Sequence, residues 1–141
     1  MTTDTLDSKE LEQVLEILTK YCRSVTDSEK EAQEMLGKIA GAVQGEEGAK
    51  LIHFDDYVFL ILVRGKGVVE VHTMGDTASP KALAAAFKKL AKYLKNIGVS
   101  MAYTYAPDKK FARLAKMVDL KVEQYTATVD KKQVYVFVVK L

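Results

Sequence analysis

Apolar residues recur at steps of three and four in two segments near the N-terminus, which is the spacing of one helix face. Asp7 precedes the first segment and Thr26 precedes the second, and each is followed three positions later by a glutamate. Such a pair caps a helix because its side chains satisfy backbone N–H groups of the first turn. We therefore expect two amphipathic helices before residue 48, the second capped by Thr26.

After residue 49 the pattern changes to short runs of β-branched and aromatic residues. Residues 50–54, 57–64 and 68–74 form these runs, separated by an Asp-Asp pair at 55–56 and a Gly-Lys-Gly turn at 65–67. Short runs of this kind between turn residues predict three antiparallel strands. The middle run is almost wholly apolar, so we expect the second strand to lie inside the sheet.

Ser79 and Pro80 mark the start of a third helix, because Ser caps helices well and Pro is favoured at the first helical position. Residues 99–106 then predict a strand, Asp108 begins a short helix, and residues 122–129 and 133–141 predict two closing strands. The expected order is helix, helix, three strands, helix, strand, helix, two strands. No segment is repeated and no linker is long, so we expect one α+β domain over residues 1–141, built on a mixed sheet.

Composition excludes several functional classes. The hydrophobic share of 48% and charged share of 28% are those of an ordinary globular protein. A formal net charge of +2 is too small to indicate nucleic acid, and no apolar run reaches the length of a membrane span. Cys22 lies at an apolar helix position, which favours a buried thiol in a reducing compartment. We therefore expect a cytoplasmic protein without a membrane or nucleic-acid partner.

The order of elements resembles the GNAT acetyltransferase fold, without its usual first strand. A second resemblance lies in residues 69–73, Val-Glu-Val-His-Thr, together with the Ala- and Lys-rich helix that follows and the Thr-x-x-Pro at 104–107. These are similar to phage-encoded GNAT-like proteins with a V-E-[VL]-H-T signature, some of which are acetyltransferases and others head-assembly or virion proteins. The resemblance implies N-acetyltransferase activity with acetyl-CoA on an unspecified acceptor. Its alternative implication is a non-catalytic assembly role with a protein partner, in the host cytoplasm or in the virion.

In GNAT enzymes a Q/R-x-x-G-x-G/A turn holds the pyrophosphate of acetyl-CoA with backbone N–H groups and a helix N-terminus. Residues 75–82 occupy this place here, but they keep one early glycine, carry an acidic Asp76 and lose a donor at Pro80. The loop is degenerate, and both a working phosphate cradle and a plain capped turn stay open. The cofactor contacts that the resemblance implies are Val71, Thr73, Met74, Ser79, Lys81 and Ala82.

Glu70 and His72 are the candidate catalytic pair. They stand two positions apart on a predicted strand and therefore share a face, where the histidine could act as a general base. A histidine with a purely structural hydrogen bond is the alternative. The tyrosine that protonates the leaving thiolate in GNAT enzymes corresponds to Ala115, which has no proton to donate. A substitute acid would have to come from a predicted strand, and the candidates are Tyr103, Tyr105 and Tyr125. Packing within the sheet is the alternative role of these three tyrosines.

Two further expectations concern partners and metals. The closing strand, residues 133–141, is apolar on both faces, which favours self-association as a homodimer. His53 and His72 are far apart in the sequence and the chain has a single cysteine, so we expect no metal site.

Overall fold

The computed structural model describes residues 8–45, 49–75, 79–106, 114, 116–117 and 120–141. Its elements follow the expected order, and their bounds are α1 (Ser8–Val25), α2 (Glu29–Gly45), β1 (Lys50–Phe54), β2 (Tyr57–Gly65), β3 (Val68–Gly75), α3 (Pro80–Asn96), β4 (Met101–Ala106), β5 (Lys121–Val129) and β6 (Lys132–Lys140). The short helix expected from Asp108 falls mostly outside the described residues, although Leu114, Lys116 and Met117 are helical.

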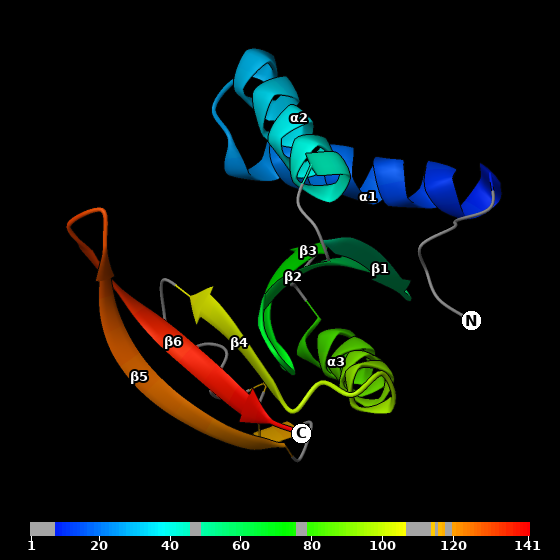
Figure 1. The fold of residues 1–141 in the computed structure, drawn as a ribbon. Helices are drawn as coiled ribbons and strands as arrows, with labels where there is room; N and C mark the ends of the chain where they lie inside the picture. The colour runs from blue at the N-terminus through cyan, green and yellow to red at the C-terminus, as the bar shows by residue number, and fades with distance from the viewer. Residues whose placement is uncertain (1–7, 46–48, 76–78, 107–113, 115, 118–119) are drawn as a thin grey trace. The chain divides into compact units, whose positions relative to one another are not determined.

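The strands form a six-stranded mixed sheet with the order β1-β2-β3-β4-β6-β5 (Figure 1). β1 pairs with β2, β4 with β6, and β5 with β6, all antiparallel. β3 and β4 pair in parallel, and α3 connects them. A parallel pair requires such a crossover, because the chain must return to the starting end of the sheet. The predicted α+β class and the mixed sheet are therefore confirmed.

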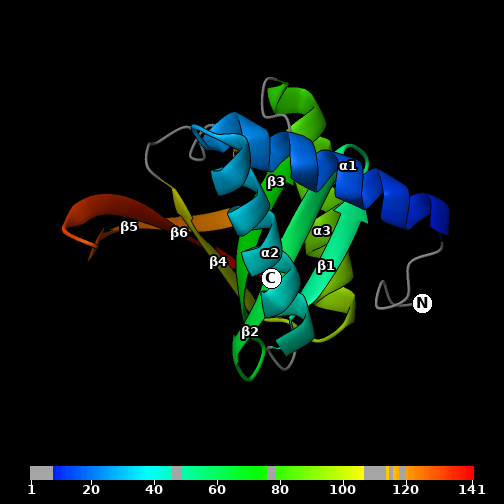
Figure 2. The same cartoon turned by 90° about the horizontal axis from the view of Figure 1, so that it is seen from above.

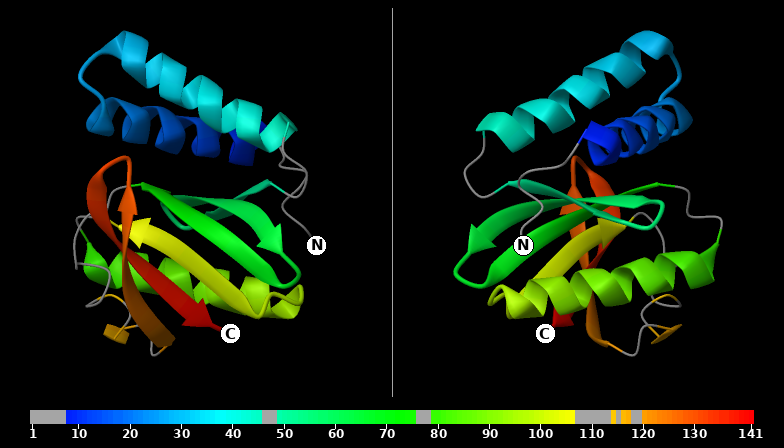
Figure 3. Two further views of the ribbon diagram at one scale, coloured as in Figure 1. Left: turned by 60° about the vertical axis from the view of Figure 1, so that its left-hand side comes forward. Right: turned by 90° about the vertical axis from the view of Figure 1, so that its right-hand side faces the viewer.

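The chain divides into two compact units, of which the first comprises residues 1–62 and 73–76. Within it α1 and α2 lie side by side (Figure 3) and β1 lies next to β2 (Figure 2). Its core is formed by buried side chains from α1, β2 and the end of β3: Val14, Leu18, Val58, Leu60, Leu62 and Met74. Cys22 is fully buried, as expected from its apolar position.

The junction between α1 and α2 corrects one prediction. The Thr26 hydroxyl donates to the Cys22 carbonyl at 2.6 Å, so it belongs to the end of α1. Ser28 caps α2 instead, because its hydroxyl oxygen accepts from the Glu31 N–H at 3.1 Å. The prediction that Thr26 caps the second helix was therefore wrong: the Thr26 hydroxyl is directed back to the last turn of α1, and Ser28, which directly precedes α2, holds the cap position.

Gly75, at the end of β3, is required by its surroundings in the first unit. Its φ of +146° is one that other residues rarely adopt. A Cβ at this position would lie 2.8 Å from Tyr57 Cδ1 and 2.9 Å from the Asp56 carbonyl oxygen.

The second unit comprises residues 63–72 and 77–141, and contains most of β3 with α3, β4, β5 and β6. Ser79 caps α3 and Pro80 occupies its first turn, as predicted. β5 and β6 form a long hairpin whose turn residues, Asp130 and Lys131, both have positive φ, at 51° and 67°. A two-residue turn with positive φ at both central positions has a backbone twist that matches the twist of the paired strands. No helix in the described part of the chain is long and apolar enough to cross a membrane.

Candidate functional site

Four polar side chains from three neighbouring strands meet in the second unit. Arg64 comes from the end of β2, Glu70 and His72 from β3, and Tyr103 from β4. Glu70 and His72 share a face because strand side chains alternate. Tyr103 is the register partner of Glu70 in the parallel β3–β4 ladder, so the two side chains stand next to each other.

The Glu70 carboxylate is the centre of this cluster. Arg64 Nε donates to its Oε1 at 3.1 Å and the Tyr103 hydroxyl donates to the same oxygen at 3.2 Å. His72 Nε2 bonds the other oxygen, Oε2. Only 12% of the Glu70 side chain is exposed, so three donors compensate a carboxylate that has lost most of its water.

The cluster holds Glu70 ionised. Burial alone would raise the pKa of its carboxyl, but hydrogen bonds from His72 and Arg64, and the charges of these two partners, bring that pKa below its ordinary value. Burial first, and then the charge of Glu70 and the hydrogen bond to it, raise the pKa of the Tyr103 hydroxyl. Tyr103 therefore stays protonated beside a carboxylate, which fits its part as a donor.

His72 is partly accessible, since 44% of its side chain is exposed. In a neutral ring, the Nε2–H donates to the carboxylate, which leaves the lone pair on Nδ1. This arrangement fixes the tautomer and gives the ring a proton acceptor. A carboxylate behind an imidazole also stabilises the charged ring that results from proton uptake.

The β3–β4 ladder ends beside this cluster. Its pairs join Val68 with Met101, Val69 with Ala102, and Glu70 with Tyr103. Within the second unit, Val71 and His72 lie beyond the last pair, although both strands continue. Glu70 and His72 therefore flank the point where the two parallel strands stop pairing.

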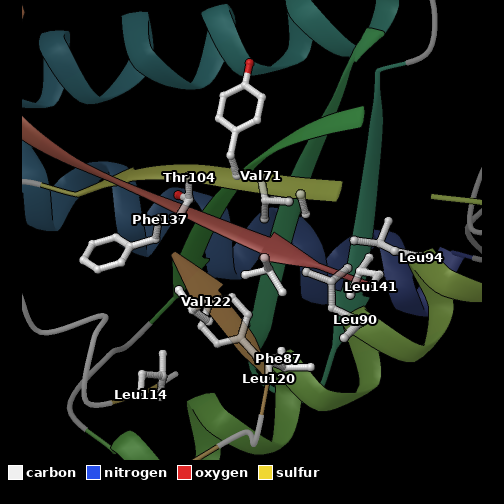
Figure 4. A pocket seen from close by; sticks show the side chains of 14 residues that line it. Val71, Phe87, Leu90, Leu94, Thr104, Leu114, Leu120, Val122, Phe137 and Leu141 are labelled. Atoms are coloured by element: carbon white, nitrogen blue, oxygen red, sulfur yellow. The ribbon is translucent and has the colours of Figure 1, made fainter. Parts of the chain in front are cut away.

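A small apolar cavity of about 40 Å³ lies in the same unit (Figure 4). Val71 and Thr104 line it from the two strands, and Leu90 and Leu94 line it from α3. Val71 stands between Glu70 and His72 in the chain, so its side chain points to the opposite face of β3. The cavity and the polar cluster thus lie on the two faces of one strand.

No family model matches the sequence, and no curated protein matches it. Solved structures do match the fold. A putative ribosomal-protein-serine acetyltransferase from Vibrio cholerae matches with a TM-score of 0.61 at 12% identity, over 100% of this chain and 96% of that one. A probable GNAT-family acetyltransferase from Chromobacterium violaceum matches with a TM-score of 0.59 at 14% identity, over 82% and 68%. The PaiA N-acetyltransferase from Thermoplasma acidophilum, in complex with coenzyme A, matches with a TM-score of 0.55 at 12% identity, over 96% of each chain.

The chain has the GNAT fold. Identities of this size establish the arrangement of helices and strands and nothing finer, so the site residues rest on the geometry of this chain.

Within this GNAT fold, the residues expected to contact the cofactor lie in three places. Val71 lines the cavity. Thr73 and Met74 fall in the first unit, where Met74 belongs to the core. The remaining three, Ser79, Lys81 and Ala82, form the first turn of α3.

The first turn of α3 uses most of its own backbone donors. The Ala82 N–H donates to the Ser79 hydroxyl at 3.3 Å, and the Leu83 N–H donates to the Ser79 carbonyl at 3.1 Å. Pro80 has no N–H, so the Lys81 amide is the donor of this turn that the cap does not use. Asp76 and the rest of the loop before Ser79 lie outside the described residues.

Sequence reasoning found Glu70 and His72, and the structure brings them together, but it missed Arg64 and Tyr103 as their partners. The sequence did contain a signal for Arg64. It is a charged residue near the end of a strand whose first six residues are buried, and side chains at alternate positions of a strand share one face. Tyr105 stands edge-on to Tyr103 at 5.8 Å between ring centres and is 45% exposed. Tyr125, the third tyrosine considered, donates to Glu123 on the same strand. Within the described residues, no group of three or more His, Cys, Asp or Glu side chains could hold a metal ion.

Proposed function

We propose that this GNAT-fold chain is a CoA-dependent N-acetyltransferase in which His72 is the general base and Glu70 positions it. The observation that carries the proposal is the Glu70–His72 hydrogen bond at the point where the parallel β3–β4 ladder ends. A half-exposed imidazole held by a buried carboxylate is an arrangement suited to proton transfer.

Each member of the cluster has a distinct part in this proposal. An amine acceptor must lose a proton as it is acylated, and in this proposal His72 Nδ1 accepts it. Glu70 is a poor base, because its pKa lies below the ordinary value, and it acts by orienting the ring and stabilising its charged form. Arg64 and Tyr103 keep Glu70 ionised and fixed through their hydrogen bonds.

Acetyl-CoA supplies an activated acetyl thioester. The residues that would hold it are Val71, beyond the last pair of the ladder, and the first turn of α3, with the Lys81 amide and side chain facing the phosphates. A solved structure with the same fold contains coenzyme A, which supports this assignment. The missing tyrosine at position 115 does not exclude the reaction, since a thiol with a pKa of about 8.5 leaves readily as a thiolate.

The test begins with calorimetric titration of acetyl-CoA and CoA, followed by thiol release in the presence of pooled primary amines. We expect binding below millimolar concentration and acyl transfer to at least one amine. His72→Gln should lower kcat/KM by roughly 10²–10⁴ without changing the affinity for acetyl-CoA, because a general base acts on the chemical step.

His53→Gln is the matched control, since His53 lies on β1 in the first unit and bonds the Asp55 carbonyl oxygen. It should leave both affinity and kcat/KM at wild-type values. No heat with acetyl-CoA at near-millimolar concentration would remove the proposal. Equal activity of the two glutamine variants would remove the assigned role of His72.

One observation favours a second candidate, a non-catalytic scaffold. The cap and Pro80 leave few free N–H groups at the start of α3, which weakens it as a phosphate site. Such a protein would act through its surface, as in the phage-assembly role that the V-E-V-H-T resemblance implies. Absence of CoA binding, together with presence of the chain in assembled particles, would favour this candidate over the enzyme.

A further inference from the structure

The α3-side cavity of the second unit is apolar almost throughout. Of the fourteen residues that line it, Tyr103 and Thr104 are the ones whose side chains carry a polar atom. Tyr103 donates its hydroxyl to Glu70. Figure 4 shows Val71 and Thr104 from the strands and Leu90 and Leu94 from α3 around this space. A cavity of this composition excludes charged groups and accepts hydrocarbon.

Its position connects the cavity to the proposed reaction. Val71 and Thr104 follow directly after Glu70 and Tyr103, which form the last pair of the β3–β4 ladder. The cavity therefore borders the place where the two strands stop pairing, opposite the face that carries His72. A group that lies between the unpaired strand segments would have the base on one side and the cavity on the other.

We propose that this cavity receives the hydrocarbon part of a short acyl group, so that a propionyl or butyryl thioester binds more tightly than the acetyl thioester. This inference rests on the proposed function, and it adds the acyl chain that the donor carries. The size of the cavity sets the limit. One water-sized group fills roughly 10–15 Å³ of such a space, so about 40 Å³ takes about three carbon-sized groups.

The same lining predicts which acyl groups are rejected. A succinyl or malonyl group would bring a carboxylate among leucine, valine and phenylalanine side chains, where no described cation faces it. The methyl of an acetyl group would leave most of the cavity empty. A straight chain longer than butyryl would exceed the space.

The test is a calorimetric series with CoA, acetyl-, propionyl-, butyryl- and hexanoyl-CoA. Burying one methylene is worth a factor of about four in affinity, so butyryl-CoA should bind about fifteenfold more tightly than acetyl-CoA. Hexanoyl-CoA should show no further gain. Equal affinities for the acetyl and butyryl compounds would overturn the inference.

Ala91→Leu fills the cavity from α3, where Ala91 lines it. Ala85→Leu is the matched control, because Ala85 is exposed on the same helix and does not line the cavity. The first variant should lose the chain-length dependence, and the second should keep it. If Ala91→Leu fails to fold, as judged by its melting curve, Ala91→Val makes the same test with a smaller side chain. Retention of the butyryl preference in a folded Ala91 variant would count against the cavity as the acyl site.

The series separates the two proposals. Binding of CoA without any dependence on acyl length would leave the proposed function standing and remove the acyl inference. Absence of binding for every compound, CoA included, would remove both.

Discussion

Replacing Glu70 with glutamine should destabilise the protein by about 2 kcal/mol at pH 7. Glutamine keeps the shape of the side chain but offers an NH2 group, so it must turn a donor toward Arg64 and Tyr103 or toward His72. A hydrogen bond to a charged partner contributes roughly 1.5–3 kcal/mol. The side chains of Arg64 and His72 are 39% and 44% exposed, so water can replace part of the hydrogen bonding that they lose. We therefore take a value near the lower end of this energy range.

The size of this effect should depend on pH in a defined way. The pKa of Glu70 in the folded protein lies below its ordinary value of 4.5, so the contribution of its charge is fully present above that value. It is lost as the pH falls through the folded pKa. The difference between the wild type and Glu70→Gln should therefore be present at pH 7, shrink as the pH falls below 4.5 and approach zero once Glu70 is protonated.

Urea unfolding at pH 7 and at a series of values down to pH 3 measures the difference directly. A loss of about 2 kcal/mol corresponds to roughly thirtyfold in the unfolding equilibrium and to about 6–8 °C in melting temperature. Glu123→Gln is the control, because the Glu123 carboxylate is exposed and its ion pair with Lys140, at 2.9 Å, should contribute nothing measurable. Equal losses in the two variants at pH 7, or a difference between the wild type and Glu70→Gln that grows as the pH falls below 4.5, would refute the reasoning.

Substitutions at four other positions have expected outcomes that thermal or urea unfolding can check. Gly75→Ala should lower the free energy of unfolding by at least about 2 kcal/mol, because a Cβ there clashes and the φ is positive, whereas Gly37→Ala in α2 meets nothing within 4 Å and should raise it by about 0.5–1 kcal/mol. Ser79→Ala should lower it by about 1 kcal/mol through loss of the α3 cap, and Ser79→Asn should restore it. Lys131→Gly should raise the melting temperature, since a non-glycine residue at a φ of 67° is strained by roughly 1 kcal/mol; a decrease would contradict the turn geometry.

Local patterns predicted the features that depend on local chemistry. The period of two along β3 was enough to place Glu70 and His72 on one face, and Ser79-Pro80 was enough to place the start of α3. The second helix cap shows the limit of such patterns. Thr26 and Ser28 each stand three positions before a glutamate, so the motif fits both, and the preceding turn of α1 decides between them.

The partners of Glu70 could not be predicted in this way. Tyr103 reaches it through the register of a parallel ladder whose strands are 33 residues apart at this point, and Arg64 reaches it across a turn. A tight turn fixes the register of a hairpin, but β3 and β4 are joined by the long crossover through α3, so no short motif fixes theirs. The cavity has the same origin, since it depends on the fit between α3 and the strands and not on any one residue.

The Glu70 cluster also provides a way to find related sequences. Overall identity to the three structures named above is 12–14%, too low for ordinary comparison to separate functional groups. The cluster has fixed spacings: an arginine six positions before the glutamate, a histidine two after it, and a tyrosine thirty-three after it. Because one carboxylate accepts from all three donors, losing the glutamate removes the acceptor that the other three share. A search for the whole set, with tolerance in the longest spacing, would select chains that share this site from the many that share only the fold.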